Sequence, residues 1–455
     1  MSATDETPKT SFKDDFFELI RGSKVIWLIY AATFFEYLGI FSFLSTLKFW
    51  LSKDHGMTDQ RAGWWAATFS TLLTAFVFIV GPLSDSVGVR RMLILSFALA
   101  ALTRLGMSLA HSQTTAIVAL LCFGFAYATT SPVLQTAVQR AVTKNARAFA
   151  FSLWYVSFNL AGVLVGPIID GLRAHFRDPV THQLVHKPVA LPLLGTHEMS
   201  AYQAILGAGF VFAVVASVLV LFIPREFGHL KDTAEPGAKK PNPLMVLKEV
   251  LVDKAFWRFM FLLVLLSLVK LIFQHMHFTW PSYVTRVNGE TFPVGTVWSI
   301  NSFLILGLAP LATALTRKMR SIDVLMVGAF LTAASPFVLC FGSSMYFQIA
   351  MIVVLTLGEA LWSPRLYEYN LSIAPPGREA TYVSLASLPY FFAKLIVGPT
   401  AGYLLAQFCP ETGPRNPALL WGIIGAVTLV GPVSIFFTRN WISKKDAPPA
   451  APAAA

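Results

Sequence analysis

Gly81-Pro82-Leu83-Ser84-Asp85-Ser86-Val87-Gly88-Val89-Arg90-Arg91 lies between two apolar runs of the chain, Trp64 to Val80 and Met92 to Leu102. Glycine permits a chain reversal that a β-carbon obstructs, so we expect a tight turn at Gly88. Asp85 falls at an expected helix end, where it can pair with an arginine or cap a neighbouring helix. Arg90 and Arg91 supply the positive charge typical of cytoplasmic helix ends. The stretch therefore predicts a short charged connection between two membrane-spanning helices.

The composition is typical of a membrane protein. Of the 455 residues, 55% are hydrophobic and only 13% are charged, whereas soluble globular domains carry about 25% charged residues. Apolar runs of about 20 residues recur along the chain, and each is long enough to cross the hydrocarbon of a bilayer. We therefore expect an all-α integral membrane protein whose main surroundings are lipid.

The net charge of +11 is unevenly distributed. Lys and Arg gather on the side of the predicted spans that holds the N-terminus, which places both termini and residues 81–91 in the cytoplasm of a cell membrane. Because the basic charge follows topology, it does not indicate nucleic-acid binding. The three cysteines, Cys122, Cys340 and Cys409, are scattered and predict neither a metal site nor a disulfide. No cofactor is expected.

Hydropathy predicts twelve spans in two halves. The expected parts are a cytoplasmic segment 1–23, a first half 24–224, a cytoplasmic linker 225–254, a second half 255–440 and a disordered tail 441–455. Besides the two spans that flank residues 81–91, the expected spans cover about 24–47, 115–138, 148–169, a stretch ending near 223, 255–278, 293–316, 322–342, 346–367, 380–406 and 417–438.

The two halves repeat each other. Ser131-Pro132 recurs as Ser363-Pro364, and Val165-Gly166-Pro167 recurs as Val397-Gly398-Pro399, both at an offset of 232 positions. One offset shared by two successive spans predicts two parallel six-helix halves.

Residues 81–91 resemble the signature loop between helices 2 and 3 of the major facilitator superfamily, which reads G-x-L-a-D-r-x-G-r-R. Gly81, Leu83, Asp85, Gly88 and Arg90 match this pattern, while Ser86 and Val89 replace two basic positions. The resemblance implies a secondary transporter that works by alternating access, with a solute site between the halves near the midplane. It also implies a conformational role for Gly81, Asp85, Gly88, Arg90 and Arg91.

Four charged residues fall near the middle of predicted spans: Glu36, Lys270, Glu359 and Lys394. Such charges are costly in a bilayer and are usually paired or functional. In the superfamily, the helices that carry them line or flank the cavity. They are either two structural ion pairs, or proton-coupling carboxylates with lysines that bind the solute or the carboxylates.

Glu359 is the preferred proton site and Glu36 the second, because Gly358 and Ala360 leave room beside Glu359. Either glutamate has Lys270 or Lys394 as a candidate partner, and the sequence leaves the pairing open. Arg104 lies on the third span, which is peripheral in the superfamily, so a structural pairing or snorkelling is expected for it.

The fifth span contains Gly162-x-x-x-Gly166-Pro167 followed by Asp170-Gly171. The pattern is similar to the antiporter motif g-x-x-x-G-P-x-x-G-G, with Asp170 in place of one glycine. Small residues let helices approach closely, so we expect helix packing at these positions and at their repeat, Gly398 and Pro399.

The segment from Trp154 to Gly162 resembles the F-Y-x-x-I-N-x-G-S-L signature of proton-coupled oligopeptide transporters, with Ala161 at a glycine position. Glu36 is similar to the second Glu of that family's E-x-x-E-R-F-x-Y-Y pattern, but Thr33 replaces the first Glu, Tyr37 the Arg, and Ile40 and Phe41 the two tyrosines. Tyr37, Asn159 and Gln274 are the polar residues that we expect to contact solute beside the charged ones.

Proton-coupled uptake of a small polar or zwitterionic solute, with a peptide among the candidates, is the function predicted first. A proton-driven exporter of drugs or metabolites is the alternative: the 38 Phe fit it, and the two midplane lysines count against it. A non-transporting membrane receptor or scaffold is the second alternative. No nucleophile–base pair, phosphate loop or metal cluster indicates an enzyme.

Overall fold

The computed structural model describes residues 24–87, 89–142, 147–191, 195–224, 252, 254–373 and 388–442. Contacts between residues divide the chain into two compact units. The first comprises Met1–Pro236 with Glu290–Phe303, and the second comprises Gly237–Gly289 with Leu304–Ala455. Residues 290–303 lie in the second half of the sequence, yet they pack with the first unit.

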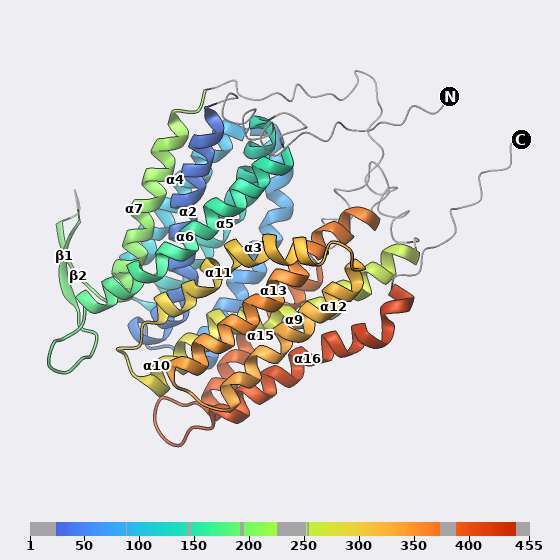
Figure 1. The fold of residues 1–455 in the computed structure, drawn as a ribbon. Coiled ribbons are helices and arrows are strands. Elements are labelled where there is room, and N and C mark those ends of the chain that lie inside the picture. The colour runs from blue at the N-terminus through green and yellow to red at the C-terminus, as the bar shows by residue number, and fades with distance from the viewer. Residues whose placement is uncertain are drawn as a thin grey trace, which may run out of the picture. The chain divides into compact units, whose positions relative to one another are not determined.

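The first unit is a set of long helices with one small hairpin (Figure 1). Its helices are α2 (Val25–Phe49), α3 (Asp59–Val87), α4 (Val89–Ser108), α5 (Gln113–Ala141), α6 (Arg147–His175) and α7 (Ala201–Leu221), and α2 continues as the π-helical η1 (Trp50–Asp54). Between α6 and α7, strands β1 (Lys187–Leu191) and β2 (Gly195–Met199) pair antiparallel, with Lys187 opposite Met199. We call the helix ends next to these strands the hairpin side.

The second unit repeats the helical pattern. Its elements are α9 (Lys254–Phe278), the short α10 (Trp280–Asn288), α12 (Ser321–Ala334) with the 3-10 turn η2 (Ser335–Cys340), α13 (Met345–Ile373), α15 (Leu388–Phe408) and α16 (Pro417–Ile442). Helix α11 (Val294–Leu315) is continuous, and the division between the units falls after its Phe303.

The prediction of an all-α membrane protein is confirmed. In the part of the chain that the structure describes, ten helices are long and apolar enough to cross a membrane. Together with α3 and α15, they correspond to the twelve predicted spans. The predicted segment 1–23, residues 380–387 of the eleventh span, most of the linker 225–254 and the tail from residue 443 lie outside the described residues.

Helices occupy more of residues 81–91 than expected. Helix α3 runs through to Val87 and α4 begins at Val89, and Gly88, where the turn is expected, lies outside the described residues. A continued helix pairs its backbone N–H and C=O groups internally, whereas a longer turn would leave more of them without partners.

Two features of the chain, one in each unit, were not predicted. Helix α6 extends past its predicted end to His175, and the β-hairpin follows it. Helix α10 is a separate nine-residue helix whose Trp280 donates a hydrogen bond to the buried side chain of Gln348, at 2.8 Å. These short amphipathic or polar elements lack the long apolar runs on which the predicted spans rest.

The core of the first unit joins α2, α4, α5 and α7. Many of its members are alanines, among them Ala128, Ala137 and Ala216, each with no more than 1% of its surface exposed. Small side chains let the helix backbones approach one another. The second unit has a bulkier core in which Phe259, Leu263 and Trp362 pack between α9, α12, α13 and α16.

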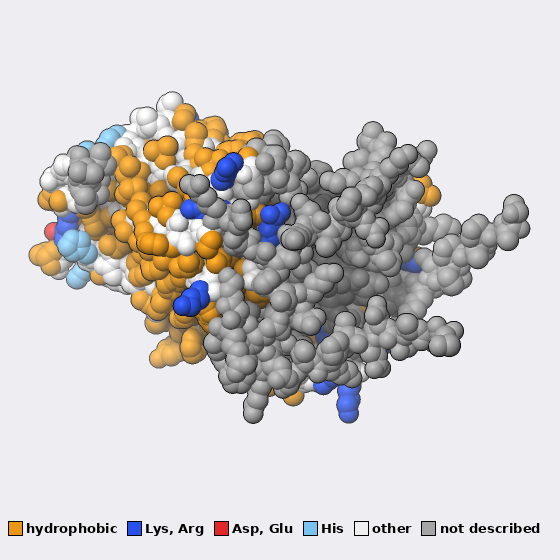
Figure 2. Space-filling model, turned by 90° about the horizontal axis from the view of Figure 1, so that it is seen from above, with side chains coloured by type: hydrophobic (Ala, Val, Ile, Leu, Met, Phe, Trp, Pro, Cys, Tyr) orange, Lys and Arg blue, Asp and Glu red, His pale blue; other side chains and the backbone are white. Residues whose placement is uncertain are grey.

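Large apolar side chains also cover the outside of the helices. Figure 2 shows one face, on which hydrophobic side chains occupy much of the described surface. Leu102, Leu315 and Phe437 are each at least 65% exposed. Such exposure is costly in water and is expected of helices that face lipid.

Candidate functional site

A buried ion pair lies inside the first unit. Two nitrogens of the Arg104 guanidinium donate hydrogen bonds to the two carboxylate oxygens of Glu36, at 2.9 and 2.8 Å, and both side chains are fully buried. A β-carbon on Gly39 would lie only 2.9 Å from this guanidinium, and one on Gly209 would lie 3.3 Å from the Arg104 side chain. The glycines of α2 and α7 therefore make the space that Arg104 fills.

This pair corrects one expectation and confirms another. Glu36 is paired with Arg104 and not with Lys270 or Lys394, whereas the structural pairing expected for Arg104 is present. The reason is that α2 and α4 both pack against α7, which brings two charges 68 positions apart in the sequence together.

The second unit holds the other three of the four charged residues singled out in the sequence. Lys270 of α9 interacts electrostatically with Glu359 of α13 and with Lys394 of α15, and all three side chains are partly exposed. We call these three residues the lysine–glutamate cluster. The Lys270 ammonium also lies 5.2 Å from the ring centroid of Trp362, within cation–π distance.

A close approach of α12 and α13 positions Glu359. A β-carbon on Gly358 would lie 2.5 Å from the backbone nitrogen of Thr332, and one on Gly328 would lie 2.8 Å from the carbonyl oxygen of Gly358. Gly358 therefore faces α12. The next residue of an α-helix is turned by about 100°, which directs Glu359 away from that contact.

Carboxylate and ammonium groups in this arrangement can exchange partners. With two lysines and one glutamate, the cluster carries a formal charge of +1 when Glu359 is ionised, and an anionic group of a solute would balance it.

The three polar residues predicted to contact solute have different surroundings. Tyr37 stacks on Phe158 with ring centroids 5.0 Å apart. Asn159 donates to the carbonyl oxygen of Tyr155 in its own helix, at 2.9 Å, and is 5% exposed. Gln274 is half-buried on α9, about one turn beyond Lys270.

An aromatic group surrounds Tyr37 in the first unit. Phe41 lies 5.6 Å and Trp154 6.3 Å from the Tyr37 ring, and Phe41 also lies 5.5 Å from Trp298. The sequence did not single out this group as a unit, because its members are dispersed among many other aromatic residues.

The signature stretch is only partly visible. Gly88 and the side chains of residues 77–86, including Gly81 and Asp85, lie outside the described residues. Arg90 contacts another helix: its Nε and Nη2 donate to the carbonyl oxygens of Ile223 and Leu221, at 2.6 and 3.1 Å. Arg90 thereby caps the C-terminal end of α7, whereas Arg91 is exposed.

The predicted packing glycines of α6 contact α11. Ser302 lies beside Gly162, and Gly295 lies beside Gly166. Pro167 follows within the same helix. In α15, Gly398 is buried and Pro399 lies half-buried next to it.

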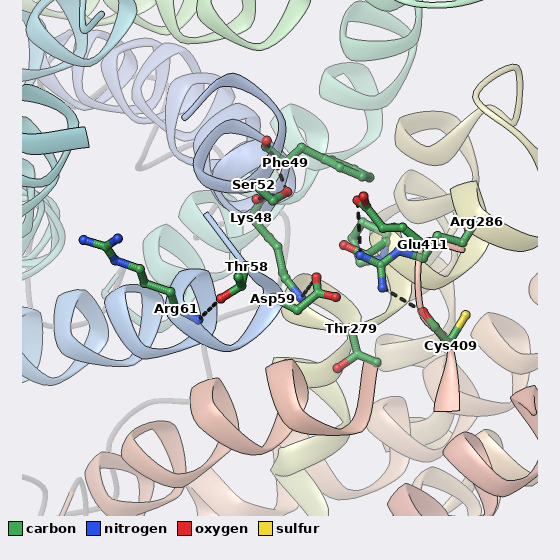
Figure 3. A network of polar contacts seen from close by, with 12 residues as sticks. Lys48, Phe49, Ser52, Thr58, Asp59, Arg61, Thr279, Arg286, Cys409 and Glu411 are labelled. Carbon is green, nitrogen blue, oxygen red and sulfur yellow. Dashed lines mark hydrogen bonds and ion pairs between the residues drawn. The ribbon is translucent and has the colours of Figure 1, made fainter. Parts of the chain in front are cut away.

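Each unit also has ion pairs near the ends of its helices, shown in Figure 3. In the first unit, Lys48 pairs with Asp59 at 3.1 Å. In the second unit, Arg286 of α10 donates to the carbonyl oxygen of Cys409, at 2.7 Å, and pairs with Glu411 at 3.5 Å. Charges near predicted helix ends were the sequence signal for these contacts, but the sequence gives no pairing.

The model of the Major Facilitator Superfamily matches residues 29–388. The chain belongs to the major facilitator superfamily. Its fold is that of a twelve-helix membrane transporter and not of an enzyme, as predicted. No curated protein matched the chain.

Solved structures with the same fold are peptide transporters of the POT family. A POT family transporter in complex with 5-aminolevulinic acid superposes with a TM-score of 0.71 at 15% identity, over 92% of this chain and 97% of that chain. An auto-inhibited POT family peptide transporter gives 0.70 at 15% identity, over 95% and 99%. A peptide transporter POT in complex with sulfate gives 0.71 at 15% identity, over 92% and 95%. At this identity, the likeness of this superfamily member to them concerns the fold.

Proposed function

We propose that this protein is a proton-coupled secondary transporter that works by alternating access and takes up a small polar or zwitterionic solute carrying a carboxylate. The lysine–glutamate cluster is the observation that supports this most. It consists of three ionisable side chains, one each from the membrane-spanning helices α9, α13 and α15. Isolated charges are costly in such helices.

The coupling follows from exchange of partners within the cluster. Lys270 balances Glu359 when the solute is absent. A solute carboxylate then competes for the lysines, Glu359 loses part of its balancing charge, and a proton binds to it. Solute occupancy and protonation are linked in this way, and the link is reciprocal.

Glu36 is assigned a structural role in this scheme. Both of its oxygens accept hydrogen bonds from Arg104 and the pair is fully buried. Protonating Glu36 would leave a buried guanidinium without its counter-charge, which is strongly unfavourable. Glu359 therefore remains as the proton site.

The proposed topology places both termini and residues 81–91 on the cytoplasmic side of a cell membrane, with the hairpin side outside. The proposed halves are 24–224 and 255–440, joined by the linker 225–254. The excess of Lys and Arg on the N-terminal side supports this orientation.

Export is the second candidate. The aromatic group around Tyr37, with Phe41, Trp154 and Phe158, would suit a large apolar solute. The two lysines of the cluster favour an anionic group instead, so carboxylate-bearing solutes are the first to be tested.

The test uses purified protein and vesicles. A ligand raises the apparent stability of the protein by mass action, so thermal unfolding with dialanine, alanine and 5-aminolevulinic acid identifies a binding solute. Its uptake into proteoliposomes is then measured with and without an inward proton gradient. Glu359→Gln is expected to abolish gradient-driven accumulation while retaining solute exchange.

Glu198→Gln is the matched control, because Glu198 is an exposed glutamate of β2. It should accumulate solute as the unmodified protein does. Full accumulation by Glu359→Gln would refute the assignment of the proton site.

A further inference from the structure

The end of α6 contacts the beginning of α11, and many of the hydrogen bonds between them involve backbone N–H and C=O groups. Residues 290–303 pack with the first unit, and the same helix continues without a break into Leu304–Leu315 of the second. Any motion of one unit against the other must therefore either bend α11 or separate its first turns from α6.

Asp170 caps α11 from a different helix. Its two carboxylate oxygens accept hydrogen bonds from the backbone nitrogens of Gly295 and Thr296, at 3.0 and 2.7 Å. These are N–H groups of the first turn, which have no acceptor within their own helix. Pro293 precedes the helix and has no side-chain acceptor, so Asp170 supplies the cap and the negative charge that the helix N-terminus favours.

Two arginines of the α6 end hold the segment before α11. Arg173 donates to the carbonyl oxygen of Phe292 at 3.0 Å, and to the backbone and carboxylate oxygens of Glu290 at 3.1 and 3.0 Å. Arg177 donates to the same Glu290 carbonyl oxygen at 2.7 Å. Arg173 is only 2% exposed, whereas the Glu290 side chain is 32% exposed, so water reaches the glutamate end of this contact.

Further along the contact, Ser299 inserts into the hydrogen-bond ladder of α6. Its hydroxyl accepts from the backbone nitrogen of Gly166 at 3.1 Å and donates to the carbonyl oxygen of Gly162 at 2.8 Å. A β-carbon on Gly295 would lie 2.5 Å from the carbonyl oxygen of Gly166, so the backbones touch there. A hydroxyl between an N–H and a C=O occupies the place that water takes in an opened helix turn.

We propose that Asp170 is a positioning residue for transport: it latches α11 to α6, and the latch opens in the step that exposes the solute site on the hairpin side. When the contact opens, water can replace the protein partner in each of the hydrogen bonds described above. The contact can therefore open without leaving buried polar groups unpaired. Asp170 stands at the position where the similar antiporter motif has glycine, and glycine has no carboxylate with which to cap α11. The proposal rests on the alternating access proposed above.

The experiment measures whether the contact opens. Cys122, Cys340 and Cys409 are replaced by serine, and Ser302→Cys places one reporter at the contact, where the serine is 4% exposed. A membrane-impermeant maleimide is added from the hairpin side. Asp170→Asn is expected to increase the rate of labelling several-fold while the unfolding temperature changes little.

Asp178→Asn is the charge-matched control. Hydrogen bonds from Thr181 and Val180 lower the pKa of Asp178, so it is ionised at neutral pH, and it lies in the connection that follows α6. It should leave the labelling rate unchanged. A rate unchanged by Asp170→Asn, or raised equally by Asp178→Asn, would overturn the proposal.

A purely structural Asp170 would lower the unfolding temperature without altering the labelling of the folded protein. If Asp170→Asn does not give folded protein, Ser299→Ala carries the same test at the other end of the contact and should also increase labelling. An unchanged rate in Ser299→Ala then counts against the latch. The labelling experiment needs no solute, so its result is independent of the role of Glu359. The latch proposal can be refuted while Glu359 remains the proton site, and it can be supported even if Glu359 is not the proton site.

Discussion

Arg104 and Glu36 form a bidentate ion pair with no exposed surface, inside the first unit and close to Gly39 and Gly209. The charged residues discussed above, Arg104 included, thus divide into two kinds. One pair is sealed within a unit and bound at both oxygens. The other three lie in the second unit, and their side chains are only partly buried.

The sealed pair gives the first prediction. Glu36→Ala should lower the apparent stability by about 3–5 kcal/mol, because it leaves Arg104 buried without a counter-charge. The double variant Glu36→Leu/Arg104→Met should recover most of that loss, since no unpaired charge remains. Thermal unfolding in detergent measures both; a double variant as unstable as Glu36→Ala would show that the charges do not act as a pair.

Lys394 gives a prediction about binding. Lys394→Gln should weaken the binding of a carboxylate-bearing solute by about tenfold, which corresponds to about 1.4 kcal/mol for a lost charge-assisted contact. The readout is the concentration of solute that gives half of the maximal rise in unfolding temperature. The control is Lys318→Gln, since Lys318 is an exposed lysine of the same unit; equal effects of the two substitutions would contradict a site at Lys394.

The cap on α7 is tested by neighbouring arginines. Arg90 donates to two carbonyl oxygens at the end of α7, so Arg90→Ala should cost about 1.5–3 kcal/mol of stability, as for bonds from a charged donor. Arg91 is exposed, and Arg91→Ala should cost much less. Unfolding temperatures compare the two proteins, and similar losses would remove the structural distinction between them.

Gly358 and Gly307 make a matched pair for helix packing. A β-carbon on Gly358 would overlap Thr332, whereas one on Gly307 would meet nothing within 4 Å. Gly358→Ala should therefore destabilise the second unit and impair transport by moving Glu359. Gly307→Ala should be neutral or slightly stabilising, since alanine favours helices by about 1 kcal/mol. A stable, active Gly358→Ala protein would show that α12 and α13 can separate without consequence.

The proposed orientation is tested by labelling single cysteines at Ser86 and His182 in intact cells. The excess of basic residues near the N-terminal side predicts that His182→Cys reacts with an impermeant reagent from outside and that Ser86→Cys reacts only after permeabilisation. Labelling of Ser86→Cys alone in intact cells would invert the topology.

Much of the architecture follows from the sequence, because a membrane span must be long, apolar and helical. The predicted spans at 24–47 and 417–438, for example, correspond to Val25–Phe49 and Pro417–Ile442. What could not be predicted depends on contacts between distant helices. Arg104 pairs with Glu36 because α2 and α4 both pack against α7. Asp170 accepts a hydrogen bond from Gly295, which is 125 positions away in the sequence. The hairpin and α10 lack the long apolar runs that mark spans.

The same limit applies to the candidate site. Mid-span position alone singled out Glu36, Lys270, Glu359 and Lys394, but it carried no information on which of them share a unit or how far each is exposed. The contact made by Ser299 could not be predicted at all, because its hydroxyl bonds to the backbone of α6, a helix distant in the sequence.

The Arg104 pair also bears on how the protein is made. An arginine is costly to insert into the bilayer, by about 2.5–3.5 kcal/mol at the centre of a helix and by less toward a helix end, where Arg104 lies in α4. Glu36 precedes it by 68 positions, so the carboxylate has already entered the membrane when Arg104 leaves the ribosome, while Gly209 is synthesised later. Insertion of α4 is then helped by an α2 that has remained beside the translocon. Loss of Glu36 should reduce the yield of correctly inserted chains even where the finished protein could tolerate the change.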